Sequence, residues 1–146
     1  LNRILFLRKV PVFADINPAD LPLVANLLSE QRFEAGQTII REGDAGDILY
    51  IVADGAVRVF HQASPETTLS ILETGECFGE LALLDDEPRS ATVETTKHST
   101  CLLLRKSDFE QLLHARPGMA MAIIRTLSRR FRDLLGKVEE RQQHRT

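Results

Sequence analysis

The amino-acid sequence predicts a mainly β fold, an eight-stranded jelly-roll-like β-barrel with N-terminal helices and a long C-terminal helix. Between residues 31 and 106, apolar side chains alternate with polar ones in short runs, as in strands. Glycine-bearing turns separate these runs at close and even spacing. On both sides of this region, the apolar spacing changes to the three and four residues of a helix. About eight short strands at this spacing favour a jelly-roll-like barrel.

Residues 1–30 are expected to form N-terminal helices. Their apolar residues recur at helical spacing, and Pro11 divides the first stretch into two short pieces because proline interrupts a helix. Asn17-Pro18 is typical of a helix start, since Asn caps the free N–H groups and Pro fits the first turn. The helix that follows is expected to continue through Leu28.

Residues 31–106 are expected to hold the strands of the barrel. The Asp54-Gly55 pair predicts a hairpin turn inside this region. Segment 78–93 is the one helical interruption in the series. The strands that can be delimited individually are 32–34, 38–41, 48–52, 57–61, 68–72, 91–95 and 100–104.

Residues 107–146 are expected to be C-terminal helices, of which the second is long. Its apolar residues step by four and three, which is typical of a coiled-coil seam: Ala120, Ile124, Leu127, Phe131, Leu134 and Val138. Two interpretations stay open, a helix that lies on its own barrel and a homodimer in which two copies pair. The arginines at 125, 129, 130 and 132 are interpreted as a solvated face.

The composition is that of a single soluble globular domain of 146 residues, with 43% hydrophobic and 27% charged residues. No run approaches the roughly 18–20 apolar residues of a membrane span, and no signal-peptide pattern opens the chain, so a cytoplasmic location is expected. Cys77 and Cys101 are interpreted as free thiols, because two cysteines do not make a disulfide framework. The chain begins with Leu1 rather than Met, which suggests a piece of a longer protein.

The charge is unevenly distributed along the chain. Residues 42–94 hold twelve acidic side chains against two basic ones, Arg58 and Arg89, so direct contact with nucleic acid is not expected. Arg89 follows Asp85-Asp86-Glu87, and two interpretations of it are open: it neutralises these acids, or it binds an anionic ligand.

Segment 78–93, FGELALLDDEPRSATV, carries the candidate binding residues. Gly79 opens a helical turn, whose first N–H groups have no internal partner and can face an anion. Arg89 returns after the acidic turn with a planar fork of donors suited to a phosphate. Glu80 stands beside the same helix start, where a carboxylate suits a neutral hydroxyl of the same ligand. Phosphate, hydroxyl and one Arg together indicate a small nucleotide.

The spacing of Gly79-Glu80-Leu81-Ala82 and Arg89-Ser90-Ala91-Thr92-Val93 also resembles a known pattern. It is similar to the phosphate-binding cassette of the cyclic nucleotide-binding domain, shared by catabolite-activator-like regulators, kinase regulatory subunits and cyclic-nucleotide-gated channels. The resemblance extends over nearly the whole chain, because the glycine turns at 42–44, 54–55 and 74–76 fall where that family turns its strands.

The resemblance implies a role for each cassette residue. The N–H groups of Leu81 and Ala82 would meet the phosphate oxygens, Arg89 would pair with the phosphate charge, and Glu80 would accept from the ribose 2′-hydroxyl. Ser90 occupies the position where the family often has Ala or Ser for cyclic AMP and Thr for cyclic GMP. Its hydroxyl either adds a phosphate contact or is merely small. The implied ligand is cyclic AMP, with cyclic GMP as the alternative; no cofactor and no metal site are expected.

The chain departs from the catabolite-activator-like pattern in two places. Those proteins read adenine with a Thr-Ser pair on the long helix, and alignment of 128–131 with their Arg-Arg stretch puts Leu134 and Leu135 at that place. Leucine cannot hydrogen-bond the edge of a base, which weakens the basis for selecting one purine. Those regulators also continue into a helix-turn-helix, whereas this chain stops at Thr146, so an output domain is expected to be absent or to precede Leu1.

The expected function is therefore a cyclic nucleotide sensor that relays occupancy through its C-terminal helix. No enzyme is predicted, because the four histidines are scattered and neither a nucleophile elbow nor a Walker-type loop is present. Two alternatives remain. One is a degenerate module that binds no ligand and acts in dimerisation or scaffolding. The other is the sensor half of a DNA-binding transcription regulator whose reader domain is absent.

Overall fold

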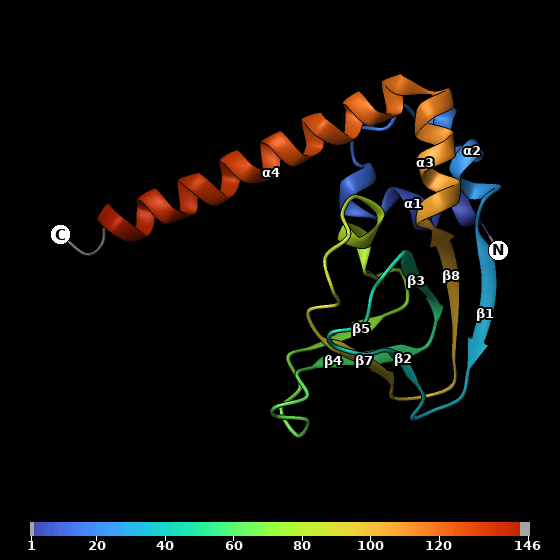
Figure 1. Ribbon diagram of the computed structural model, residues 1–146, viewed down its shortest axis with the longest axis vertical. Coiled ribbons are helices and arrows are strands. Elements are labelled where there is room, and N and C mark those ends of the chain that lie inside the picture. The colour runs from blue at the N-terminus through green and yellow to red at the C-terminus, as the bar shows by residue number, and fades with distance from the viewer. Residues whose placement is uncertain (1, 144–146) are drawn as a thin grey trace.

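Two four-stranded antiparallel sheets form the body of the protein in the computed structural model, which describes residues 2–143 (Figure 1). The first sheet has the order β1-β8-β3-β6, with β1 Ser29–Phe33, β8 Ser99–Arg105, β3 Ile48–Asp54 and β6 Cys77–Phe78. The second has the order β2-β7-β4-β5, with β2 Thr38–Ile40, β7 Thr92–Thr95, β4 Ala56–Phe60 and β5 Ser70–Glu73. Leu1 and residues 144–146, included in the predicted terminal helices, lie outside the described residues.

The prediction of a mainly β, jelly-roll-like fold with flanking helices is confirmed, but the two sheets do not close into a continuous barrel. Each sheet ends in a short strand with one partner, since β6 pairs only with β3 and β5 only with β4. β6 was not predicted, because a strand of two residues shows no periodicity. The predicted strand 57–61 ends one residue early, at Phe60.

The neighbouring strands β3 and β8 carry the core of the molecule. Both alternate between two hydrophobic clusters. Leu49, Ile51, Leu102 and Leu104 face the helices, whereas Tyr50, Val52, Cys101 and Leu103 face the second sheet. The first sheet is therefore buried on both faces along these strands, which explains their nearly continuous apolar sequence.

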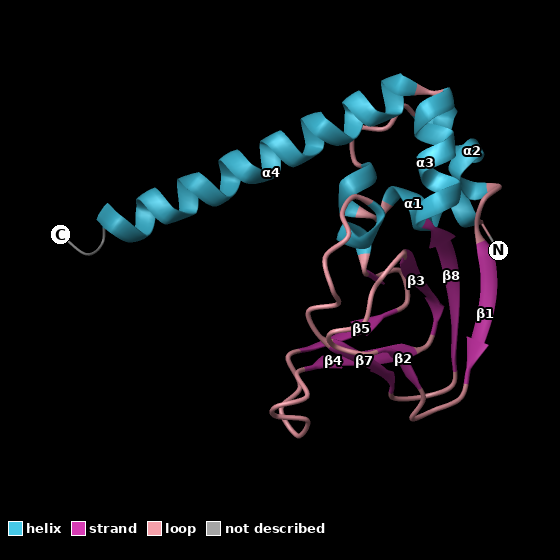
Figure 2. Ribbon diagram, viewed as in Figure 1, coloured by secondary structure: helices cyan, strands magenta, loops and turns pink. Residues whose placement is uncertain are grey.

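The helical elements gather at one end of the sheets (Figure 2). They are α1 Arg3–Arg8, the 3₁₀ turns η1 Pro11–Phe13 and η2 Pro18–Asp20, α2 Leu21–Ala25 and α3 Lys106–Ala115. The break at Pro11 is confirmed, and so is the Asn17 cap, whose side-chain oxygen accepts from the Ala19 N–H at 3.0 Å. α2 ends at Ala25 rather than Leu28, because the next residues turn directly into β1.

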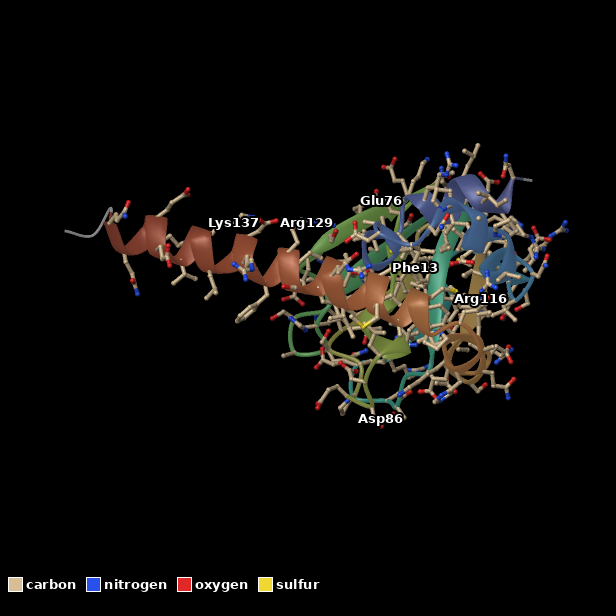
Figure 3. All side chains as sticks on the ribbon, turned by 90° about the horizontal axis from the view of Figure 1, so that it is seen from above. Phe13, Glu76, Asp86, Arg116, Arg129 and Lys137 are labelled. Carbon is tan, nitrogen blue, oxygen red and sulfur yellow. The ribbon has the colours of Figure 1, made fainter. Side chains whose placement is uncertain are left out.

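The long helix α4, Pro117–Gln143, packs on its own domain only along its first part. Its buried residues are Met119, Ala122, Ile123 and Thr126. Beyond them α4 projects past the body, as Figure 3 shows from near Arg116 past Arg129 to Lys137. The projecting part exposes Phe131, Leu134, Leu135 and Val138, between 46% and 62% accessible. The two open interpretations therefore concern different stretches of α4. The first part lies on its own domain, and the exposed part is the stretch through which two copies would pair.

Asp15 fastens α4 to the N-terminal segment. Its Oδ2 accepts from the Thr126 hydroxyl at 2.9 Å and pairs with Arg129 Nη1 at 2.9 Å. The hydrogen bonds from Arg129 and Thr126 lower the pKa of this carboxyl from its ordinary value. The expected solvated arginine face is thus incomplete, because Arg129, although exposed, pairs with its own domain. Within residues 2–143, no helix combines the length and apolar character needed to cross a bilayer.

Phe109 of α3 packs between the helices and the sheets. Shortening its side chain should therefore destabilise the protein strongly. Its side chain is fully buried, and its ring lies 5.5 Å from that of Phe13. Phe109→Ala should lower the free energy of unfolding by about 3–5 kcal/mol in urea titrations, since it leaves a cavity. Leu69→Ala, at a 51% exposed side chain, is the control and should change it by less than about 0.5 kcal/mol. Equal effects would contradict this assignment of the core.

Candidate functional site

All six residues predicted from the sequence line one pocket of about 520 Å³: Gly79, Glu80, Leu81, Ala82, Arg89 and Ser90. The 3₁₀ turn η3, Glu80–Leu83, and the segment 85–91 form one side of it. Ile40, Val59 and Val93 of the second sheet and Pro11 of η1 also line it. The walls are therefore largely apolar, with a few charged groups among them.

Gly79 makes the sharp passage from β6 into η3. Its φ of 77° lies in the left-handed region, which favours glycine. A Cβ at this position would also stand 2.5 Å from Arg89 Nη1 and 2.9 Å from the Ile48 carbonyl oxygen. The turn uses the Ala82 N–H, which donates to the Gly79 carbonyl at 3.1 Å, so a ligand oxygen would have to share this donor. The phosphate contacts of Leu81 and Ala82 stay a prediction.

Arg89 is partly buried and has no acidic partner. Its Nη2 donates to the Ile48 carbonyl at 2.9 Å, and it forms no ion pair with any described carboxylate. Partial burial lowers the pKa of this guanidinium from its ordinary value, because removal from water disfavours the charged form.

The interpretation that Arg89 only neutralises the preceding acids is wrong. Lys106 at the start of α3 pairs with Asp86 and donates to the Asp85 carbonyl at 2.8 Å. The hydrogen bond to Asp86 raises the pKa of Lys106 from its ordinary value. The acidic turn therefore finds its cation in α3, and the charge of Arg89 is left to the pocket.

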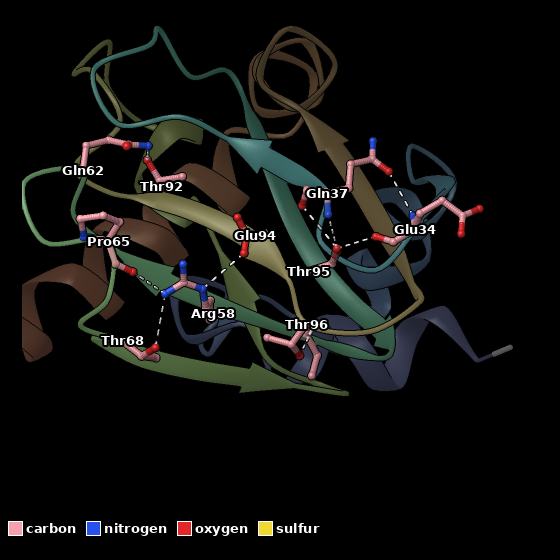
Figure 4. A network of polar contacts seen from close by, with 11 residues as sticks. Glu34, Gln37, Arg58, Gln62, Pro65, Thr68, Thr92, Glu94, Thr95 and Thr96 are labelled. Atoms are coloured by element: carbon pink, nitrogen blue, oxygen red, sulfur yellow. Dashed lines mark hydrogen bonds and ion pairs between the residues drawn. The ribbon is translucent and has the colours of Figure 1, made fainter.

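Arg58, the other cation of the acidic stretch, has a purely structural environment. Its guanidinium pairs with Glu94 at 3.4 Å and donates to the Pro65 carbonyl at 2.8 Å, as Figure 4 shows. It also lies 3.9 Å from the centre of the Phe60 ring. The contrast identifies Arg89 as the basic residue of residues 42–94 that forms no ion pair with a described carboxylate, although the charge of Asp47 acts on it from nearby.

Glu80 connects three elements at the edge of the pocket. Its Oε2 accepts from the Val12 N–H of η1 at 3.1 Å, and its Oε1 pairs with Arg130 Nη1 of α4 at 3.1 Å. The side chain is only 15% exposed. Arg130 was assigned to the solvated face of the helix, and this contact corrects that prediction, because Arg130 pairs with a carboxylate that lies fifty residues earlier in the sequence.

Three further side chains, Tyr50, Phe78 and Cys77, lie at or near the pocket. Tyr50 and Phe78 stack with ring centres 5.0 Å apart, and burial raises the pKa of Tyr50 while the nearby charge of Arg89 opposes that rise. Cys77 lines the pocket, and burial, with Glu80 and Glu76 nearby, raises the pKa of its thiol to about 12. The thiol is therefore neutral at physiological pH and a weak nucleophile.

Sequence reasoning did not find Val12, Gly46 or Ile48, which contact Glu80 and Arg89. Val12 and Ile48 act through main-chain groups, which have no signature in the side-chain sequence. Gly46 acts through the absence of a side chain. Among residues 2–143, no group of three or more His, Cys, Asp or Glu side chains is placed to hold a metal ion.

Comparison with known proteins agrees with this geometry. The family model for the cyclic nucleotide-binding domain matches residues 30–116. The cyclic AMP receptor protein of Thermus thermophilus is 34% identical over 125 residues, which cover 84% of this chain and 58% of the relative. A cGMP-dependent protein kinase of Plasmodium berghei is 40% identical over 96 residues, which cover 66% of this chain and 11% of the kinase.

A solved structure shows the same architecture. The N-terminal domain of a transcriptional regulator from Streptomyces coelicolor superimposes with a TM-score of 0.82 at 33% identity, covering 91% of this chain and 94% of that domain. The chain itself spans less than two thirds of the length of the two curated relatives. Because the family model matches more than half of the sequence, the chain belongs to the cyclic nucleotide-binding domain family.

Proposed function

We propose that the pocket binds cyclic AMP in preference to cyclic GMP, and that the chain relays occupancy through α4. The observation that carries the proposal is the charge of Arg89: a partly buried guanidinium without a carboxylate partner lines the pocket. A buried charge without a partner is costly, and one phosphate charge would compensate it. The pocket volume, about 520 Å³, lies in the range of about 300–1,000 Å³ usual for small-molecule sites.

Glu80 supports a ligand that offers a hydroxyl beside its phosphate. The carboxylate borders the pocket close to Gly79 and the start of η3, where the phosphate is proposed to bind. A ribose 2′-hydroxyl that donates to Glu80 would share or replace the contact with Arg130. Cyclic nucleotides carry a phosphate and a 2′-hydroxyl on one ring, and this chemistry distinguishes them from a free phosphate.

The same contact supplies a route from ligand to helix. Arg130 belongs to α4, so any change at Glu80 alters one of the polar contacts that hold this part of the helix, beside those of Asp15 with Thr126 and Arg129. Leu134 and Leu135 lie on the exposed part of α4 and do not line the pocket. They would cover the base only after the helix moves, which supplies the two states that a relay requires.

Selection between the two purines rests on few groups in this proposal. Ser90 is exposed at the pocket rim, and its hydroxyl would favour the binding mode of cyclic AMP. The leucines of α4 contribute apolar cover to either base. We therefore propose a preference for cyclic AMP that is modest, because a missing hydrogen bond of this type is worth about 0.5–1.5 kcal/mol.

A homodimer through α4 is part of the proposal. Six of the large exposed hydrophobic side chains belong to this helix: Met121, Ile124, Phe131, Leu134, Leu135 and Val138. They recur at three, four and seven residues, so they form a continuous apolar stripe, and a second copy would cover it. A transcriptional role is the second candidate function, since the well-matched Streptomyces domain is part of a transcriptional regulator.

Arg89→Leu should abolish measurable binding of cyclic AMP. Removing one partner of a buried, hydrogen-bonded charge pair costs about 3–5 kcal/mol, a loss of two to four decades in affinity. Titration calorimetry measures the affinity, and circular dichroism checks that the sheets remain. Arg125→Leu is the charge-matched control, because Arg125 is exposed and forms no ion pair among the described residues. Normal binding by Arg89→Leu would refute the proposed phosphate site.

Glu80→Ala should weaken binding without ending it, and should remove the discrimination against a 2′-deoxy ligand. A hydrogen bond with one charged partner is worth about 1.5–3 kcal/mol, or about 10- to 150-fold in affinity. The parent should therefore bind 2′-deoxy cyclic AMP more weakly by this factor, and Glu80→Ala should bind both ligands alike. Arg130→Met is the matched variant and should keep the discrimination, since it leaves Glu80 in place. An unchanged ratio of affinities in Glu80→Ala would show that Glu80 does not contact the ribose.

Phe131→Glu should convert a homodimer into a monomer at micromolar concentration, because it places a charge in the middle of the apolar stripe of α4. Phe131 is 62% exposed within one copy. Multi-angle light scattering measures the mass, with Leu5→Glu as the control at a 53% exposed side chain far from α4 in sequence. A monomeric parent at high concentration, both with and without cyclic AMP, would overturn the dimer.

A further inference from the structure

The loop between β2 and β3 is joined to Arg89 through the main chain. The Gly43 N–H donates to the Arg89 carbonyl at 2.8 Å, and the Arg89 N–H donates to the Asp44 carbonyl at 2.8 Å. Ala45 and Pro88 form an isolated antiparallel bridge beside them. The main chain of Arg89 is therefore hydrogen-bonded to a loop that precedes it by more than forty residues. These bonds fix the position of the Arg89 α-carbon, from which the side chain extends.

The same loop leaves a space that the Arg89 side chain fills. A Cβ built on Gly46 would stand 2.1 Å from Nε, 2.5 Å from Cζ and 2.6 Å from Cδ of Arg89. On the other side, a Cβ on Gly79 would stand 2.5 Å from Nη1. We call the space between these two glycines the Gly46–Gly79 slot. The guanidinium in the slot donates from Nη2 to the Ile48 carbonyl, whose oxygen lies close to Gly79.

Gly46 has no conformational reason to be glycine. Its φ lies outside the left-handed region, whereas Gly43 in the same loop has a φ of 88° and open space around its α-carbon. At Gly43 the backbone requires glycine, and at Gly46 only the Arg89 side chain does. The atoms in conflict at Gly46 belong to the middle of that side chain, so a small movement of its tip would not relieve the overlap.

We propose that Gly46 is a positioning residue for anion binding, which holds the Arg89 side chain in the Gly46–Gly79 slot before a ligand arrives. With Nη2 bonded to the Ile48 carbonyl, the remaining guanidinium N–H groups have no described partner and stay free for an anion in the pocket. Preorganisation of this kind raises affinity because no side chain has to be ordered during binding. The identity of the anion as cyclic AMP rests on the proposed function; the slot itself does not.

An alanine at position 46 would drive Arg89 out of the slot and break its bond to Ile48. The pocket beside Arg89 is open enough to receive the displaced side chain, so the fold should survive. Binding would then require Arg89 to be ordered again against its new neighbours. The affinity for cyclic AMP should fall by about ten- to a hundredfold, the effect expected for one charge-assisted hydrogen bond that is badly placed.

The experiment is a double-mutant cycle between positions 46 and 89, measured first without ligand. Gly46→Ala should lower the urea midpoint of the parent, and it should leave the midpoint of the Arg89→Ala variant unchanged, because the overlap is gone. Gly118→Ala is the matched control, since Gly118 has open space and no left-handed φ. It should leave the midpoint unchanged or slightly raised. An equal fall of the midpoint in both backgrounds would overturn the slot.

The second measurement is the affinity for cyclic AMP by titration calorimetry. Gly46→Ala should bind more weakly than the parent and Gly118→Ala equally well. Unchanged affinity in Gly46→Ala, with the ligand-free coupling present, would overturn the positioning role in binding. A parent that binds no cyclic AMP would refute the ligand assignment of the proposed function, and the ligand-free cycle would still decide whether Gly46 holds Arg89.

Discussion

The charge of Arg89, the basic residue among those that line the pocket, organises the site. The guanidinium of Arg89 lies partly buried between two glycines, with one backbone carbonyl as its partner. This placement needs a residue without a side chain on one side, which is Gly46 just before β3, and a left-handed turn on the other, which is Gly79 just after β6. It also needs the acidic turn before Arg89 to pair with another cation, and Lys106 of α3 is that cation. Sheets, turn and helix thus each contribute to leaving one cation available.

Polar contacts also connect the pocket to the helices. Glu80 is shared between η1 and α4, and Asp15, a few residues after η1, holds two more groups of α4. The N-terminal segment therefore lies between the pocket and the helix and contacts both. A ligand hydroxyl at Glu80 would act on a junction of three elements rather than on one side chain, which gives the proposed relay a physical basis.

The sequence was sufficient for the mainly β architecture and for the candidate residues that line one pocket, and insufficient for the partners of those residues. The glycine turns and short apolar runs located seven of the strands, although β3 and β8, which are buried on both faces, show a nearly continuous apolar sequence rather than a period of two. The cassette residues were proposed as binding residues because Gly79 and Arg89 each have a chemistry that few other residue types offer. The partners of those residues could not be inferred. The Val12 N–H, the Ile48 carbonyl and the empty α-carbon of Gly46 are features of the backbone, and the Glu80–Arg130 pair depends on where α4 crosses the domain.

The position of β8 in the first sheet has a consequence for synthesis of the protein. β8 lies between β1 and β3, and its pairing joins residues 29–33 to residues 99–105. A ribosome that has released only the first hundred residues exposes β1 and β3 without the strand that separates them. The sheet, and with it the floor behind Arg89, can form only after Arg105 has left the exit tunnel. Until then the apolar residues of β3 depend on neighbouring segments or on chaperones for cover.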